Sequence, residues 1–125
     1  MQNIYPVLIY QDARAAIEFL ETGFGFEPRA VHDGENGAVA HAELELGGEV
    51  IMLSSSSEGN DRFNQAVGNY SLYVVVDDPD AHHARAKDAG AEIVLGLKDE
   101  DYGSRGYTAR DPEGNLWSFG TYRPS

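Results

Sequence analysis

The sequence predicts an α+β fold built from two tandem βαβββ modules, and three observations lead to this prediction. The chain has 125 residues, which is the size of one ordinary domain. A shift of 66 residues lays the second half of the sequence on the first. Each half begins with an apolar run, continues with helical spacing and ends in strand-like runs. We expect module one at residues 1–57, a polar linker at 58–69 and module two at 70–125.

Each module opens on a predicted strand that leads directly into a helix. The runs at 5–10 and 71–76 are rich in β-branched and aromatic residues, which favours strands. Asp12 and Asp78 follow these runs, and aspartate is a preferred residue at a helix N-cap. Pro79 suits the first helical position, where its missing N–H has no partner to lose. The same order of signals in both halves supports the repeat.

Apolar residues at helical spacing predict one helix per module, ending near Gly25 and Gly90, which permit a left-handed exit. The predicted apolar stripes are Ala13, Ala16, Ile17, Leu20 and Phe24 in the first helix, and Ala81, Ala84, Ala86 and Ala89 in the second. The remaining strands are expected at 38–46, 48–53, 106–110 and 114–119. Each half therefore reads as strand, helix and three further strands.

Charge and composition restrict the partners of this chain. It carries 21 acidic against 9 basic residues, a formal charge of −12, so it repels nucleic acid and anionic membrane surfaces. It has no cysteine, which excludes disulfides and thiolate metal ligands. No apolar run approaches the ~18 residues of a membrane helix, and the first residues do not resemble a signal peptide. We expect a cytoplasmic protein.

Four segments carry a resemblance to a known family. They are Gly23-Phe24-Gly25-Phe26-Glu27, Val76-Asp77-Asp78-Pro79-Asp80-Ala81, Tyr102-Gly103-Ser104-Arg105, and Asp111-Pro112-Glu113-Gly114-Asn115-Leu116-Trp117. With the doubled βαβββ pattern, they resemble the vicinal-oxygen-chelate superfamily, which includes glyoxalases, extradiol dioxygenases, fosfomycin-resistance enzymes and bleomycin-resistance proteins. This resemblance implies that each sheet curls into a half-cup, that two half-cups close around a ligand either within one chain or across two chains, and that the protein is a homodimer.

The resemblance also implies where a divalent metal would bind in the enzymes of this family. Its ligand positions, in the first and last strand of each module, fall on Tyr5, Met52, Ser71 and Ser118. None of these offers the carboxylate or imidazole that such ions prefer. We therefore expect no metal cofactor and a closer likeness to the metal-free, bleomycin-resistance-like branch. A binding protein that sequesters a cationic or aromatic, antibiotic-like organic molecule is the favoured function.

Strand alternation predicts which residues line the cup, because successive side chains point to opposite faces. The residues expected there are Tyr5, Val7, Met52, Ser71, Tyr73 and Ser118, while the parity of Trp117 assigns it to the core. Tyr102 precedes a glycine in a loop and is the candidate for stacking on a ligand at the rim. Arg105 either binds a ligand carboxylate or pairs internally with Asp99 or Asp101.

Histidines provide the alternative hypothesis, an enzyme. His41 and Glu43 share one face of the strand at 38–46 and form either a ligand-binding pair or a solvated face. As a base–acid pair, or as ligands of one divalent transition metal, they would support a glyoxalase-like lyase or isomerase. His82 and His83 are predicted to lie on the surface of the second helix, and His32 in an exposed loop.

Overall fold

A computed structural model describes residues 2–56 and 70–124, and the predicted linker at 58–69 lies outside the described residues. It confirms an α+β fold with two similar modules. Module one contains β1 (Val7–Tyr10), α1 (Ala13–Phe19), the π-helical turn η1 (Leu20–Phe24), β2 (Glu27–Asp33), the 3₁₀ turn η2 (Glu35–Gly37), β3 (Val39–Leu46) and β4 (Glu49–Ser55). Module two contains β5 (Ser71–Val75), α2 (Pro79–Asp88), β6 (Glu92–Asp99), β7 (Arg105–Arg110) and β8 (Leu116–Gly120).

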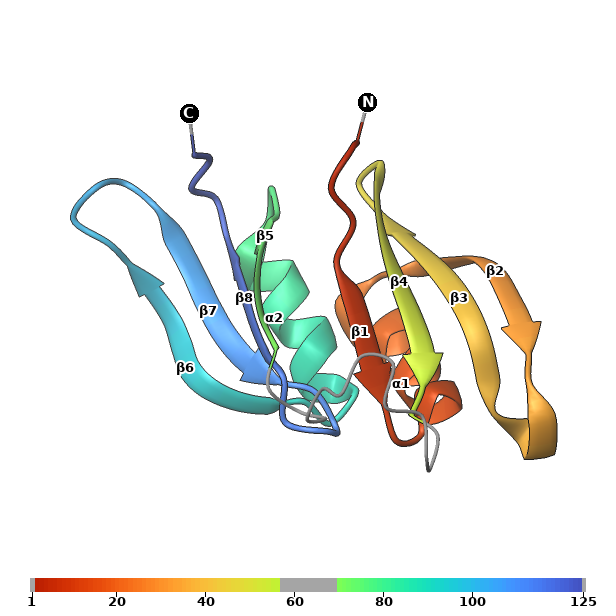
Figure 1. Cartoon of the computed structure of the whole chain (residues 1–125). Coiled ribbons are helices and arrows are strands. Elements are labelled where there is room, and N and C mark those ends of the chain that lie inside the picture. The colour runs from red at the N-terminus through yellow and green to blue at the C-terminus, as the bar shows by residue number, and fades with distance from the viewer. Residues whose placement is uncertain (1, 57–69, 125) are drawn as a thin grey trace.

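Both modules use one topology. The strand order is β1-β4-β3-β2 in the first sheet and β5-β8-β7-β6 in the second. In each sheet the first strand pairs parallel with the last, and the remaining pairs are antiparallel. Figure 1 shows the two helices in the middle of the molecule with one sheet on each side. The outer face of each sheet is therefore free of helices.

The two helices begin where the sequence predicts. The carboxylate of Asp12 accepts a hydrogen bond from the Ala15 amide, and that of Asp78 from the Ala81 amide, each at 3.1 Å. The first helix differs from the prediction near its end, because its last turn widens into η1 before Gly25 takes a left-handed φ of 91°.

The buried face of α2 differs from the predicted alanine stripe. Ala81 and Ala84 are exposed, whereas Pro79 and Ala86 are buried and His82 is half-buried. The prediction of His82 as a surface residue was therefore wrong. The prediction considered only apolar residues for the buried face. Both ring nitrogens of His82 make hydrogen bonds within the protein, which allows this polar ring to pack against the core.

One continuous core joins the modules. Leu8 and Leu53 of the first sheet and Trp117 and Phe119 of the second are at most 1% exposed and belong to the same cluster. The ring of Phe24, at the end of η1, lies 5.5 Å from that of Trp117 and 4.8 Å from that of Phe119. The predicted assignment of Trp117 to the core is confirmed. No helix among the described residues is long and apolar enough to cross a membrane.

The Asp-Pro-Glu-Gly-Asn turn at 111–115 ties module two to module one. The buried carboxylate of Asp111 accepts hydrogen bonds from the Tyr10 hydroxyl at 2.7 Å and from the Trp117 indole at 3.0 Å. The Glu113 carboxylate accepts from the backbone amides of Gln11 and Asp12, at the start of the first helix. The motif is therefore a structural joint, which fixes how the two sheets are placed relative to each other.

Candidate functional site

The outer face of the module-two sheet carries a pocket of about 730 Å³. Its floor is formed by Gly106, Thr108, Ser118 and Gly120 on the two inner strands β7 and β8. One wall is formed by β6, through Leu95, Leu97 and Lys98. A volume of this order is typical of sites for small organic molecules.

Two glycines leave part of the floor of this pocket without side chains. A Cβ atom at Gly106 would lie 2.4 Å from the Phe119 carbonyl oxygen, and one at Gly120 would lie 3.0 Å from the Tyr73 hydroxyl. Between them, the hydroxyls of Thr108 and Ser118 hydrogen-bond to each other at 2.9 Å. This pair is a polar contact point in a floor that otherwise exposes backbone and carbon.

Three tyrosines converge on one wall of the pocket, and we call them the tyrosine cluster: Tyr73, Tyr102 and Tyr122. The Tyr73 hydroxyl donates to the Tyr122 carbonyl at 2.7 Å, and the Tyr102 and Tyr122 rings meet edge to face at 5.5 Å. Partial desolvation raises the pKa of Tyr73, which keeps its hydroxyl protonated. The side chains remain 44%, 69% and 48% exposed, so large aromatic surfaces are available to a ligand.

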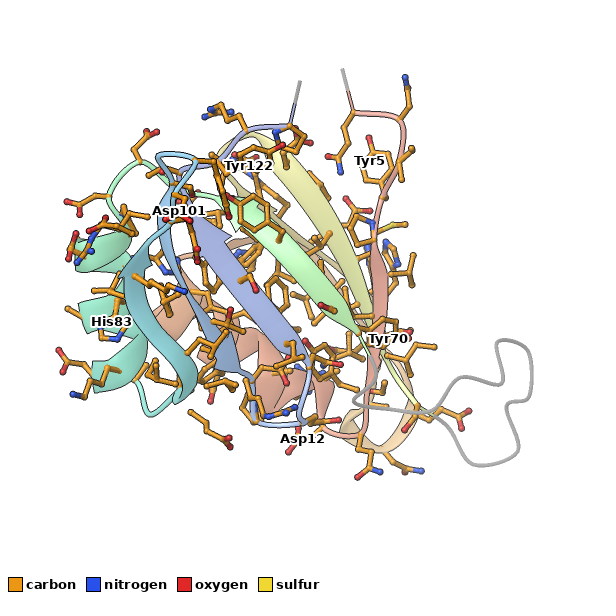
Figure 2. All side chains as sticks on the ribbon, turned by 90° about the vertical axis from the view of Figure 1, so that its left-hand side faces the viewer. Tyr5, Asp12, Tyr70, His83, Asp101 and Tyr122 are labelled. Atoms are coloured by element: carbon orange, nitrogen blue, oxygen red, sulfur yellow. The ribbon has the colours of Figure 1, made fainter. Side chains whose placement is uncertain are left out.

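The sequence analysis identified Tyr73 and Tyr102 but missed Tyr122. Tyr122 follows β8, and residues 118, 120 and 122 alternate onto the pocket side, so strand parity extended by two residues would have found it. Figure 2 views this sheet face on, with Tyr122 at its upper end and Tyr5 away from it, on the N-terminal segment.

Arg105 does not line the pocket, because its guanidinium binds two carboxylates. It contacts Asp80 of α2 at 2.9 Å and Asp99 of β6 at 3.3 Å. The hydrogen bond from Arg105 holds the pKa of Asp80 below its usual value. Of the two roles open to Arg105 in the sequence, this geometry favours internal pairing, with Asp99 as one of the partners.

Of the other predicted ligand-binding residues, Ser71 is exposed at the start of β5 and does not line the pocket, and the rest lie in module one, on the outer side of its sheet. On this face the His41 imidazole Nε2 lies 2.9 Å from a carboxylate oxygen of Glu43. Met52 of β4 is the register partner of both Val7, which is 40% exposed, and Glu43. The Tyr5 hydroxyl donates a hydrogen bond to the Gln2 carbonyl. None of these residues lines the module-two pocket, so the two outer faces are separate surfaces within one chain.

His32 is placed differently from the prediction. It lies in β2, not in a loop, and its backbone pairs with that of His41. Residues opposite each other in an antiparallel pair point to the same side, and the two imidazoles stack with centroids 6.1 Å apart. The apolar run that usually marks a strand is missing from the exposed β2, which explains the error.

The four family metal positions do not fit a metal ion. The Tyr5 hydroxyl and the Ser118 hydroxyl are engaged in hydrogen bonds within the protein. Met52 offers a thioether and Ser71 a neutral hydroxyl, which are poor ligands for hard or borderline divalent ions. In residues 2–56 and 70–124, no group of three His, Cys, Asp or Glu side chains is arranged to hold an ion.

A second cavity, of about 620 Å³, lies at the junction of the modules. Its apolar lining includes Phe26, Val74 and Trp117, which belong to the shared core or pack against it. The Gln2 side-chain amide lines its rim and pairs with both backbone groups of Val50, like an additional residue of a neighbouring strand. This cavity combines residues from both modules, so strand parity within one module does not predict it.

Comparison with known proteins agrees with the fold. Two uncharacterised proteins, from Mycobacterium bovis and Mycobacterium tuberculosis, are 32% identical over 92% of this chain and 80% and 71% of their own lengths. The crystal structure of TioX from Micromonospora sp. ML1 is 32% identical, with a TM-score of 0.79 over 97% of this chain and all of that one. A glyoxalase/bleomycin resistance protein/dioxygenase family enzyme from Burkholderia phytofirmans is 20% identical, with a TM-score of 0.75 over 93% of this chain and 94% of that one.

A family model matches residues 4–119, which include all the described strands except the last residue of β8. That match spans both modules and includes Tyr102 and the floor residues Gly106, Thr108 and Ser118. The chain belongs to the glyoxalase/bleomycin resistance protein/dioxygenase superfamily.

Proposed function

We propose that this protein binds and sequesters a small organic molecule that carries an aromatic ring system. The observation that supports this most directly is the tyrosine cluster on a wall of the module-two pocket. Ring-on-ring contact is favourable by about 0.5–1.5 kcal/mol beyond the burial of area. Leu95 on β6, which is 64% exposed, supplies an apolar surface for the remainder of the ligand.

Charge favours a cationic ligand over an anionic one. The whole chain carries a formal charge of −12, which attracts cations over several ångströms in dilute salt. A ligand cation over a tyrosine ring also gains cation–π attraction. Lys98 and Glu100 both line the pocket, so the charge of its wall is close to neutral. The aromatic ring of the ligand, more than its charge, therefore determines binding.

We further propose that a second copy of the chain completes the site. The pocket is open to solvent and is formed by module two alone, while Val7, His41, Glu43 and Met52 lie on a similar outer face of module one. In a homodimer the module-one face of one chain can cover the module-two pocket of the other. Sedimentation velocity at several protein concentrations tests this: a monomer at all concentrations, with and without ligand, contradicts it.

Calorimetric titration tests the binding function. Acridine orange, a planar aromatic cation, and bleomycin are suitable probes, with benzylamine as a small cation that lacks a fused ring system. Tyr102→Leu should weaken acridine orange binding about 2- to 10-fold, because the ring contact is lost. Tyr102→Phe, which keeps the ring, should bind like the unmodified protein. No heat with any fused-ring probe would overturn the proposal.

The His41–Glu43 contact favours a second candidate function, proton transfer in a lyase or isomerase reaction. A carboxylate that holds an imidazole is a common arrangement for a general base. A glyoxal, the substrate class in the family's name, is the probe for this function. His41→Ala and Glu43→Gln should each abolish turnover while the circular dichroism spectrum is unchanged, and turnover in both variants would contradict this candidate.

A further inference from the structure

The outer face of module one carries two neighbouring histidines, and only one of them, His41, takes part in the functions proposed above. His32 on β2 and His41 on β3 are direct register partners, and their rings stack at 6.1 Å with an angle of 20°. His32 is exposed, and His41 is half-exposed. Among the described residues, the ring nitrogens of His32 have no hydrogen-bond partner. Two accessible imidazoles on one rigid sheet are a chelating arrangement.

Glu43 determines which nitrogen of His41 is available. A carboxylate can only accept a hydrogen bond, so the 2.9 Å contact with Nε2 requires the proton on Nε2. In the neutral ring Nδ1 then carries the lone pair. An imidazole that donates one N–H to a carboxylate and binds a metal through its other nitrogen is the usual outer-shell arrangement in metalloproteins.

We propose that His32 and His41 together bind one borderline divalent ion such as Zn²⁺, Ni²⁺ or Cu²⁺, with Glu43 as the positioning residue for His41. With metal–nitrogen distances of about 2.1 Å, the centroids of two imidazoles on one ion lie about 5 to 6 Å apart. The observed separation of 6.1 Å is close to this range, but the two rings are nearly parallel at 20°, so the exposed His32 ring has to rotate about its side-chain bonds to point a nitrogen at the shared ion. Imidazole nitrogen favours these ions over Mg²⁺ or Ca²⁺.

This site differs from the family metal positions, none of which is a histidine. It has two protein ligands, since no three suitable side chains converge in the described part of the chain. Water or a bound molecule fills the remaining positions, as in open metal sites. An open site on this face would present a Lewis acid to a ligand held between the two faces of a dimer.

Calorimetry of protein without an affinity tag, in 150 mM NaCl with excess Mg²⁺, tests the proposal. One Zn²⁺ or Cu²⁺ per chain should bind, with Cu²⁺ the tighter ion and Mn²⁺ the weaker. His32→Ala and His41→Ala should each lower the affinity at least tenfold, while His83→Ala, which removes a histidine from α2, should not. The site would be overturned if both variants bind Zn²⁺ with unchanged affinity, or if excess Mg²⁺ abolishes the heat of Zn²⁺ binding.

The role of Glu43 needs its own variant. Glu43→Gln should weaken Zn²⁺ binding about tenfold by losing the carboxylate that orients His41. Glu45→Gln is the matched control, because Glu45 is on the same strand face but binds Arg29. In ¹⁵N spectra of the imidazoles, added Zn²⁺ should shift Nδ1 of His41 and leave His82 unchanged. Shifts confined to other histidines would contradict the assignment. The result is independent of acridine orange binding, which tests the module-two pocket.

Discussion

His82 shows how one side chain combines packing with a fixed protonation state. Its Nε2 lies 2.8 Å from the Phe24 carbonyl, and its Nδ1 lies 2.6 Å from the Tyr107 hydroxyl. A carbonyl only accepts, so Nε2 donates and Nδ1 accepts from Tyr107 in the neutral ring. Burial, with a smaller effect of the nearby Arg85 charge, lowers the pKa of His82. The neutral imidazole therefore joins α2 to the end of η1.

The lowered pKa of His82 predicts a loss of stability in acid. Below about pH 6.5, the ordinary histidine pKa, the unfolded chain takes up a proton that the folded ring resists, so the free energy of unfolding falls with pH. One group changes the free energy of unfolding by at most about 1.4 kcal/mol per pH unit, which bounds this effect between pH 6.5 and pH 5.5. Urea denaturation at pH 7.5 and 5.5 measures it.

The control for this experiment is the neighbouring histidine. His82→Gln should show a smaller difference in unfolding free energy between the two pH values than the unmodified protein. His83→Gln, one residue further along α2, should show the unmodified difference. An equal pH dependence in His82→Gln and the unmodified protein would show that other groups cause the acid sensitivity.

At the scale of elements, the close approach of β7 to β8 depends on the absence of a side chain at one position. A Cβ at Gly106 would meet the Phe119 carbonyl oxygen at 2.4 Å, so β7 and β8 would have to separate. Gly106→Ala should lower the free energy of unfolding by about 1–3 kcal/mol. Gly96→Ala on β6, where a Cβ has nothing within 4 Å, should be close to neutral. Thermal melts of both variants distinguish these outcomes, and similar melting temperatures would contradict the argument.

The sequence predicted elements best where one local signal decides the structure. The aspartate caps and the alternation of the inner strands were read correctly, because they depend on near neighbours and on burial of one face. The buried face of α2 was predicted wrongly because a hydrogen-bonded histidine takes the place of an apolar residue there. The strand β2 was missed because both of its faces are exposed. Tyr122 was missed because it lies beyond the predicted last strand at 114–119, although the alternation of that strand continues to it.

At the scale of the whole molecule, the two modules should unfold together, because they share a core and the joint at Asp111. Its carboxylate accepts from the Tyr10 hydroxyl, the Trp117 indole and the Asn115 side-chain amide, all buried. Burial and the Asp111 charge raise the pKa of Tyr10 far above its usual value, so its hydroxyl stays a donor.

Asp111→Ala would remove the acceptor of all three donors while they remain buried. Each such group costs about 1–3 kcal/mol, so the variant should lose at least about 3 kcal/mol of stability, whereas Tyr10→Phe, which removes one donor, should lose about 1 kcal/mol. Urea denaturation followed by Trp117 fluorescence in module two and by the Leu8 amide signal in module one measures both changes. The two probes should report one midpoint in every variant, since the modules form one cooperative unit. Separate midpoints in the unmodified protein would mean that each module is stable without the other, and that the joint sets only their relative orientation.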